Sequence, residues 1–159
     1  KWLFGVEPDR IQVVVHPQSV VHSAVQYQDG AVKAQLGVPD MRVPIQLALS
    51  YPQRLSSQFP RLDWYQMQDL TFERPDMEKF RCLQMAYRAL SEGGNMPCVL
   101  NASNEVVNLA FRQGRCGFLQ MADIVERTLD AVTFQQDNTL EDYLACDAEA
   151  RRISAQMLQ

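Results

Sequence analysis

His16 and His22 are the only two histidines of the 159-residue chain. At neutral pH an imidazole can bind a phosphate, transfer a proton or ligate a metal. A histidine at the end of a strand is also often a structural hydrogen-bonding residue. Neither histidine has an aspartate or cysteine neighbour in sequence that would complete a catalytic triad or a metal site. The residue types alone therefore leave a functional and a structural role open.

A second candidate segment is Pro39, Asp40 and Met41, which follows a turn-rich stretch and precedes a helical pattern. Loops held by rigid strands often carry binding residues. The structural alternative is that Asp40 caps the following helix and that Met41 fills a core. We expect the capping role for Asp40 in either case.

The segment Asn101–Glu105 combines amide and carboxylate side chains, but its place at an expected helix start explains it structurally. Asn101 would cap that helix, and Glu105 would lie favourably near its N-terminus. Carboxylates are common at solvated helix starts without any metal, and four further acidic residues have such positions. These are Glu141, Asp142, Asp147 and Glu149.

The elements that position the histidines are a strand and a hairpin. The β-branched run Ile11–Val15 ends at His16-Pro17, which predicts a buried strand, because proline cannot donate to a strand ladder. Asp29-Gly30 separates two alternating segments and predicts a hairpin whose two-residue turn has positive φ at both central residues. The residues that share a face are Val25 and Tyr27 before the turn, and Val32, Ala34 and Leu36 after it.

Helical spacing begins after the hairpin. Met41–Tyr51 places Ile45, Ala48 and Leu49 on one side and is ended by Pro52. The next stretch, Pro52–Pro75, is rich in proline and aromatic residues and has no helical period longer than a turn. It predicts a connector with a short strand at Leu70–Phe72.

Three amphipathic helices are predicted in the region that follows. Asp76 caps the first, which ends at Gly93-Gly94. Asn101 caps the second, and the third spans about Leu119–Val132 without a good capping side chain at its start.

The last part of the chain predicts a fourth helix. Thr139–Asp142 resembles a capping box with aspartate in the usual glutamate position, and it should open a short helical turn. Asp147 then caps the final helix. Because four amphipathic helices cannot bury their apolar stripes alone, we expect them to pack as a bundle.

Composition limits the classes of function. With 47% apolar and 21% charged residues, the chain is globular and not disordered. No apolar run approaches the roughly 20 residues that span a bilayer, so no membrane partner is expected. A net charge of −4 without a lysine or arginine cluster argues against a nucleic-acid partner.

The cysteines give no sign of a metal site. There is no Cys-x-x-Cys pair and no histidine nearby to complete zinc ligation. An even number leaves disulfides formally open, but buried free thiols of a cytoplasmic protein are the simpler interpretation. The four residues are Cys82, Cys98, Cys116 and Cys146.

Three sequence blocks, HPQSVVHS, QLGVPDMRVPI and LNASNE, resemble the C-terminal part of the 1-deoxy-D-xylulose 5-phosphate (DXP) reductoisomerase family. The resemblance implies an α+β fold: a β-strand and hairpin remnant of an α/β catalytic domain, a connector and a C-terminal four-helix bundle-like domain. The implied boundaries are 1–51 for the catalytic part, 52–75 for the connector and 76–159 for the helical domain.

The resemblance also implies a function. Family members convert DXP to 2-C-methyl-D-erythritol 4-phosphate in non-mevalonate isoprenoid synthesis, with NADPH and Mg²⁺ or Mn²⁺, as cytoplasmic homodimers. By resemblance, His22 borders the active site as a catalytic residue, and Pro39 and Met41 contact the nicotinamide end of the cofactor. His16 would anchor the turn at Pro17. None of this chain's residues is expected to ligate the metal.

Family members also carry a dinucleotide-binding domain, an acidic metal cluster and an Asn-Lys-Gly-Leu-Glu segment upstream of HPQS. None of these occurs in the sequence, and Lys1–Phe4 resembles the tail of the helix after that segment. We therefore expect a fragment that is inactive alone. The alternative is a non-enzymatic assembly module whose active-site resemblance is vestigial.

Overall fold

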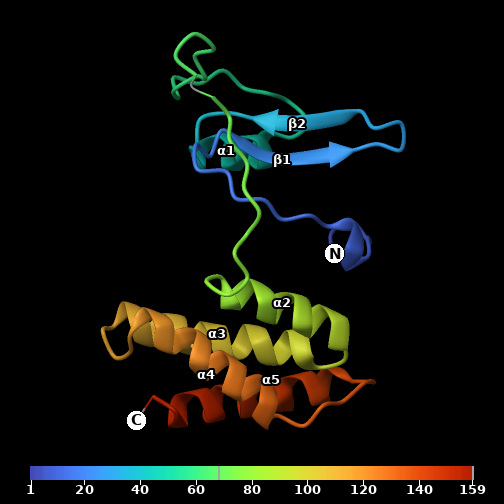
Figure 1. The fold of residues 1–159 in the computed structure, drawn as a ribbon, viewed down its shortest axis with the longest axis vertical. Helices are drawn as coiled ribbons and strands as arrows, with labels where there is room; N and C mark the ends of the chain where they lie inside the picture. Colours follow the sequence, from blue (N-terminus) through green and yellow to red (C-terminus); the bar gives the residue numbers. More distant parts are fainter. Residues whose placement is uncertain (68, 159) are drawn as a thin grey trace. The chain divides into compact units, whose positions relative to one another are not determined.

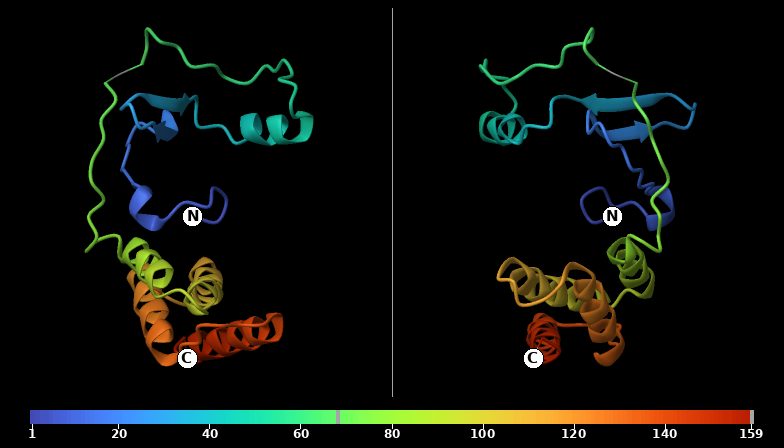
Figure 2. Two further views of the ribbon diagram at one scale, coloured as in Figure 1. Left: turned by 90° about the vertical axis from the view of Figure 1, so that its right-hand side faces the viewer. Right: turned by 60° about the vertical axis from the view of Figure 1, so that its left-hand side comes forward.

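The computed structural model describes residues 1–67 and 69–158. It contains helices and a two-stranded sheet, so the predicted α+β class is confirmed (Figure 1 and Figure 2). The elements in chain order are the 3-10 helix η1 (Pro8–Arg10), strands β1 (Val21–Gln26) and β2 (Val32–Leu36), and helices α1 (Arg42–Ser50), α2 (Arg81–Glu92), α3 (Met96–Arg112), α4 (Phe118–Ala131) and α5 (Leu140–Gln156). Within the described residues, no helix is long and apolar enough to cross a membrane.

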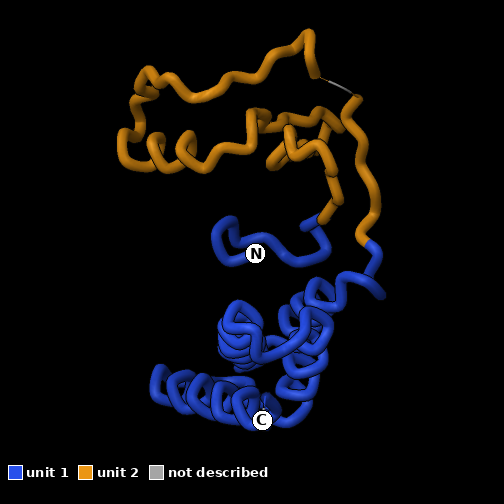
Figure 3. The backbone as a smooth tube through the Cα atoms, turned by 90° about the vertical axis from the view of Figure 1, so that its left-hand side faces the viewer, with its two compact units in different colours: residues 1–12, 76–159 blue, residues 13–75 orange. Residues whose placement is uncertain are grey.

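The chain divides into two compact units (Figure 3). One comprises residues 1–12 and 76–159, with η1 and helices α2 to α5, and the other comprises residues 13–75, with the hairpin and α1. The predicted division at residues 51 and 75 stays a prediction. All three predicted site residues lie in the second unit, which is called the hairpin unit below.

Strands β1 and β2 pair antiparallel, as the sequence predicts, but the predicted two-residue turn is wrong. The Tyr27 N–H donates to the carbonyl of Ala31 at 2.8 Å, and the Gly30 N–H donates to the carbonyl of Tyr27 at 3.0 Å. Three residues therefore connect the pair Tyr27 and Ala31. Within this loop only Gly30 has a positive φ, of 85°. A single glycine in the left-handed region is typical of three-residue hairpin loops.

The predicted buried strand Ile11–Val15 is wrong. Val15 alone forms a bridge, exchanging two hydrogen bonds of 2.9 Å with Glu73, while Val13 and Val14 are exposed. A β-branched run forms a strand only when a neighbouring segment provides hydrogen-bond partners for its backbone. Within residues 1–67 and 69–158, Glu73 is the only strand partner of this run. The predicted short strand at Leu70–Phe72 is also wrong, since the bridge lies at the next residue, Glu73.

Helix α1 agrees with the predicted helix to within a residue at each end and stops before Pro52. Asp40 caps it as predicted, because its Oδ1 accepts the backbone N–H of Arg42 at 2.9 Å. The apolar side of α1 is not covered, since Ile45 and Leu49 are both exposed. Indeed, no described residue of the hairpin unit is buried.

The first unit, residues 1–12 and 76–159, is called the helical unit below, and it contains the buried apolar core of the described chain. Helix α3 contacts α2, α4 and α5, so its buried face is surrounded by the other three helices (Figure 1). Each helix contributes apolar residues to one cluster, which confirms the prediction of a packed bundle. The buried residues include Met85 and Ala89 of α2, Val99 and Val107 of α3, Ile124, Val125 and Leu129 of α4, and Cys146 and Ala150 of α5.

Two predicted helix starts are wrong. Helix α2 begins at Arg81, because Asp76 instead caps a separate turn by accepting the N–H groups of Glu78 and Lys79. Helix α3 begins at Met96, and Asn101 lies exposed inside it. Pro97 explains the earlier start, since proline is well suited to the first helical turn.

The last two helices are closer to their predictions. Helix α4 starts and ends one residue before its predicted bounds, and the capping box at Thr139 and Asp142 is present. Helix α5 continues without a break from this box, so the predicted second cap at Asp147 is wrong. Asp147 lies inside α5 and pairs with Arg151 at 2.7 Å, one turn further on.

Asn95 joins the start of α3 to the loop between α4 and α5. Its side chain is 1% exposed, donates to the carbonyl of Thr133 at 2.9 Å and accepts the backbone N–H of Gln135 at 3.0 Å. The preceding Gly94 has a φ of 53°, and a Cβ there would collide with the carbonyl oxygen of Gln135. The loop between α4 and α5 therefore lies so close that position 94 must be glycine, and the buried amide of Asn95 forms hydrogen bonds to the loop.

We expect Asn95→Ala to lower the free energy of unfolding by about 2 kcal/mol, because it removes two hydrogen bonds from a buried side chain to the backbone of the α4–α5 loop. Urea denaturation monitored by circular dichroism measures the change. Asn108→Ala is the matched control on the exposed part of the same helix and should shift stability by less than about 0.5 kcal/mol. Equal stability of the two variants would contradict the role assigned to Asn95.

Candidate functional site

His22 lies at an irregularity in β1. The strand pairs run from Gln26 with Val32 to Ser23 with Gln35, but the next pair joins Val21 to Leu36. His22 is thus an extra residue without a partner on β2, which defines a β-bulge. Bulges are frequent beside active sites, where they change the direction of a side chain.

The imidazole of His22 contacts a side chain of the opposite strand. Its Nδ1 lies 3.1 Å from Oε1 of Gln35, and Nε2 of Gln35 donates to the backbone carbonyl of Leu36 at 3.2 Å. Both side chains are exposed. The bond therefore orients the ring while leaving its other edge accessible.

The loop that leaves β2 begins beside this pair. The Gly37 N–H donates to the carbonyl of Val20 at 3.0 Å, which closes the hairpin below the bulge. A Cβ on Gly37 would lie 3.6 Å from Nε2 of Gln35 and 3.9 Å from Cε1 of His22. The start of the loop and the histidine ring are thus close neighbours.

The rest of the loop is stiffened by Asp40. Its carboxylate accepts the backbone N–H of Arg42 and forms a bidentate pair with the guanidinium, with a shortest distance of 2.6 Å. Hydrogen bonds from the Arg42 side chain and backbone hold the pKa of the Asp40 carboxyl below its usual value. On either side of Asp40, Pro39 is exposed and Met41 is 71% exposed. Met41 therefore fills no core within the described chain.

His16 is held differently. Its Nδ1 donates to the carbonyl of Thr71 at 2.8 Å, and its ring stacks on Phe72 with centroids 4.5 Å apart. The carbonyl of His16 accepts the Ser19 N–H at 3.0 Å, which closes a turn around Pro17. These contacts agree with the anchoring role predicted for His16.

The hairpin unit thus brings His22 to the start of the loop that carries Pro39 and Met41. The roles of these three residues stay predictions. Gln35 was missed because a two-residue turn would pair His22 with Gly37, whereas the observed register pairs Ser23 with Gln35. The sequence around Asp29-Gly30 does not indicate the bulge. Only a hairpin loop of three residues, instead of two, would have suggested that Ser23 pairs with Gln35.

Metal-binding groups do not gather in the part of the chain that the structure describes. No group of three or more histidine, cysteine, aspartate and glutamate residues lies close enough to hold an ion there. The four cysteines are free, but the prediction that all are buried is wrong, since Cys82 is exposed. Burial, together with the neighbouring Cys146, raises the pKa of Cys98 to about 11, which disfavours a reactive thiolate.

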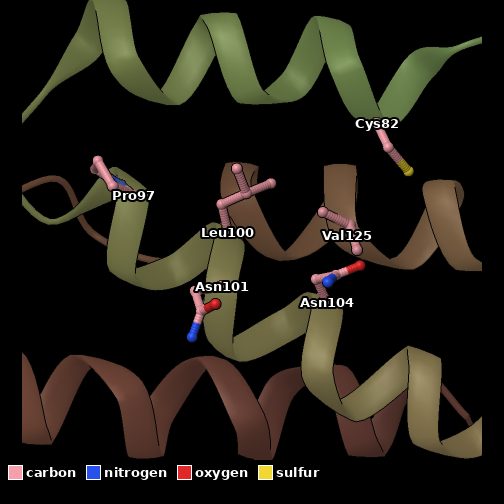
Figure 4. Close-up of a pocket in the computed structure, with 6 residues that line it drawn as sticks. All are labelled: Cys82, Pro97, Leu100, Asn101, Asn104 and Val125. Carbon is pink, nitrogen blue, oxygen red and sulfur yellow. The ribbon is translucent and has the colours of Figure 1, made fainter. Parts of the chain in front are cut away.

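A cavity of about 370 Å³ lies in the helical unit between α2, α3 and α4 (Figure 4). Its wall combines apolar residues with two amides and a thiol: Cys82, Pro97, Leu100, Asn101, Asn104 and Val125. Glu105, one turn beyond Asn101, pairs with Arg151 of α5 at 2.6 Å. This ion pair across two helices agrees with the structural role predicted for the LNASNE block.

The blocks around His22, the β2–α1 loop and α3 occur together in one known family. The profile of the DXP reductoisomerase C-terminal domain matches residues 36–153. The chain belongs to this family. The resemblance stated from the sequence is thereby confirmed.

Curated relatives extend the match to nearly the whole chain. The 1-deoxy-D-xylulose 5-phosphate reductoisomerase of Bacteroides fragilis is 57% identical over 158 residues, which is 99% of this chain and 41% of the relative. That of Bacteroides thetaiotaomicron is 58% identical over 158 residues, with 99% and 40% covered. The chain therefore spans about 41% of the length of the B. fragilis relative.

Solved structures of the family have the same fold over this region. A reductoisomerase from Zymomonas mobilis in complex with NADPH is 42% identical, with a TM-score of 0.86 over 99% of this chain and 42% of that one. A DOX-P reductoisomerase in complex with NADPH, fosmidomycin and magnesium is 40% identical, with a TM-score of 0.91 over 98% and 40%.

Proposed function

We propose that this chain is the C-terminal portion of an NADPH- and divalent-metal-dependent reductoisomerase that converts DXP to 2-C-methyl-D-erythritol 4-phosphate in the cytoplasm. The observation that carries the proposal is the 57% identity to a reductoisomerase over 158 residues, a span that includes the whole hairpin unit. A structural neighbour that contains NADPH and magnesium supports the cofactor assignment.

In this proposal the β2–α1 loop receives the nicotinamide end of NADPH. Pro39 and Met41 suit a planar ring because they are apolar, exposed and two residues apart on a loop that Asp40 and Arg42 stiffen. A flexible thioether can lie against an aromatic ring at little entropic cost. NADPH, when bound, would supply the hydride, while these two side chains would position the ring and exclude water from its face.

His22 would act on the substrate. Its ring lies beside the start of the same loop, and its bond to Gln35 leaves Nε2 available to a ligand. The described residues do not fit a metal site, because they contain no suitable cluster of ligands. The metal ligands of the proposed enzyme would thus come from the part of the protein that this chain does not span, and no role in metal binding is assigned to His22.

The experiment that tests the proposal compares the printed chain with the full-length protein that carries it. With DXP, NADPH and Mg²⁺, the full-length protein should oxidise NADPH, which is followed by its absorbance. The printed chain alone should not oxidise NADPH, because residues 1–67 and 69–158 contain no cluster of metal ligands. Turnover by the purified chain would contradict the predicted inactivity, whereas a full-length protein without turnover would favour the alternative of a non-enzymatic assembly module.

Met41→Ala in the full-length enzyme should raise the NADPH Michaelis constant by roughly tenfold, the factor that about 1.4 kcal/mol represents. The reason is the loss of a sulfur–aromatic contact and of cover over the nicotinamide. Since Met41 is 71% exposed, the variant should keep the melting temperature of the wild type. Metal dependence should not change.

Leu49→Ala is the matched control for Met41, because Leu49 is an exposed apolar residue of the adjacent helix α1. It should leave the Michaelis constant for NADPH unaltered. A normal constant in the Met41 variant, or an equal effect of both substitutions, would remove the cofactor assignment.

We also propose that the hairpin takes part in a two-fold homodimer. Within the described residues each strand pairs on one side only, and a free strand edge is a template for pairing with another chain. Sedimentation of the printed chain at tens of micromolar should give a dimer, and Val32→Lys should weaken it, because a lysine on an exposed strand edge opposes pairing. A monomer for both proteins would count against the dimer.

A further inference from the structure

We propose that Gln35 is a positioning residue that holds His22 in the tautomer with the proton on Nδ1, so that Nε2 accepts a hydrogen bond from a substrate hydroxyl. The inference rests on the proposed function only for the identity of the ligand. The tautomer itself follows from the contacts of Gln35. It would make Gln35 a determinant of which substrate group His22 recognises.

The first step is the orientation of the Gln35 amide. Its nitrogen donates to the carbonyl of Leu36 at 3.2 Å. Turning the amide over would bring its oxygen against that carbonyl oxygen, which offers lone pairs only. The nitrogen therefore faces Leu36, and Oε1 faces His22.

The second step is the tautomer. A neutral imidazole has one N–H donor and one bare nitrogen acceptor. Because Oε1 of Gln35 can only accept, the proton of a neutral His22 must be on Nδ1, which lies 3.1 Å away. Nε2 then has a free lone pair, and the structure gives this atom no partner among the described residues. If the ring gains a proton, Nδ1 still donates to Gln35, so the ring keeps its orientation in both charge states.

The third step is the placement of the pair. His22 is the extra residue of the β-bulge, between Val21, which pairs with Leu36, and Ser23, which pairs with Gln35. Without the extra residue, the regular register would place His22 opposite Leu36. The chain at Gly37 passes near the pair, since a Cβ added there would lie within ordinary contact distance of both side chains. The bulge and the loop therefore hold the two groups together at the edge of the hairpin.

The tautomer selects the chemistry of the ligand. A bare Nε2 accepts a hydrogen bond from a hydroxyl, whereas a phosphate oxygen would require an N–H at this atom. DXP carries both hydroxyl and phosphate groups. In the proposed enzyme His22 would thus contact a hydroxyl of the sugar chain, and the phosphate would be bound elsewhere.

Nitrogen NMR of the printed chain tests the tautomer without any activity. His16 and His22 are the only imidazoles, and protonated and bare ring nitrogens have widely separated ¹⁵N shifts. About two pH units above the ordinary imidazole pKa, His22 should show a protonated Nδ1 and a bare Nε2. His16 is an internal reference, since its Nδ1 donates to a backbone carbonyl that Gln35 does not touch.

Three variants make the test specific. Gln35→Leu removes the acceptor and should give His22 a mixture of tautomers. Gln35→Glu loses the bond to Leu36 but keeps an oxygen acceptor for His22, so it should keep the proton on Nδ1. Gln26→Leu, the same change on the other strand of the hairpin, should have no effect. A bare Nδ1 in the wild type, or an unchanged His22 spectrum in Gln35→Leu with intact His16 signals, would overturn the assigned tautomer.

Kinetics of the full-length enzyme test the positioning role. Gln35→Leu should lower kcat about tenfold, at the low end of the losses seen when a group that orients an active-site histidine is removed. Gln35→Glu should restore most of the rate, and the Michaelis constant for NADPH should be unchanged in both. Wild-type kcat in Gln35→Leu would overturn the role. An inactive wild-type enzyme would instead refute the proposed function, while the NMR result would still decide the tautomer.

Discussion

Hydrogen bonding, rather than buried apolar surface, holds the hairpin unit in shape. None of its described residues is buried, so its form depends on polar contacts that pair distant backbone segments. The main ones are the Val15–Glu73 bridge, the His16–Thr71 bond, the β1–β2 ladder and the Gly37–Val20 bond. Backbone N–H and C=O groups need partners in any compact structure. In this unit, satisfying them places His22 next to the β2–α1 loop.

The helical unit is stabilised in a different way. Its four helices bury a continuous apolar cluster around α3. Its buried polar residues have hydrogen-bond partners, as in the contact of Thr128 with Ser154 at 3.0 Å. Area burial of this kind tolerates moderate changes at the surface. A buried amide such as Asn95 tolerates removal less well, because its hydrogen bonds to Thr133 and Gln135 join the start of α3 to the α4–α5 loop.

The sequence predicted the elements better than their ends. Apolar periodicity located helices α1 to α5 and the hairpin, because these patterns follow from the geometry of helix and strand. The errors arose where local chemistry was ambiguous. Asn101 and Asp147 have the side chains of helix caps but lie inside α3 and α5, where tertiary packing continues the helix. Ile11–Val15 has strand propensity, but among the described residues only Val15 has a strand partner, which is Glu73.

The candidate site was predictable in part. The sequence indicated His22 and the Pro39–Met41 loop through motif resemblance, and the structure places the histidine beside the start of that loop. Gln35 could not be found in this way. Its relation to His22 depends on a loop one residue longer than expected and on a bulge in β1, and neither has a clear sequence signal. Register errors of one residue are enough to change which side chains meet across a hairpin.

The hydrogen bond between His22 and Gln35 is weakened by its exposure to water. Hydrogen bonds that face bulk water contribute little net free energy, because water competes for the same groups. His22 and Gln35 are exposed, and Val25, Val32 and Ile45 expose apolar surface in the same unit. Cover over this surface would remove competing water and strengthen the polar contacts of the histidine. The hairpin unit thus orients the hydrogen-bonding groups of His22 and Gln35. The rest of the proposed enzyme must exclude water from these groups before their orientation can affect the rate of the reaction.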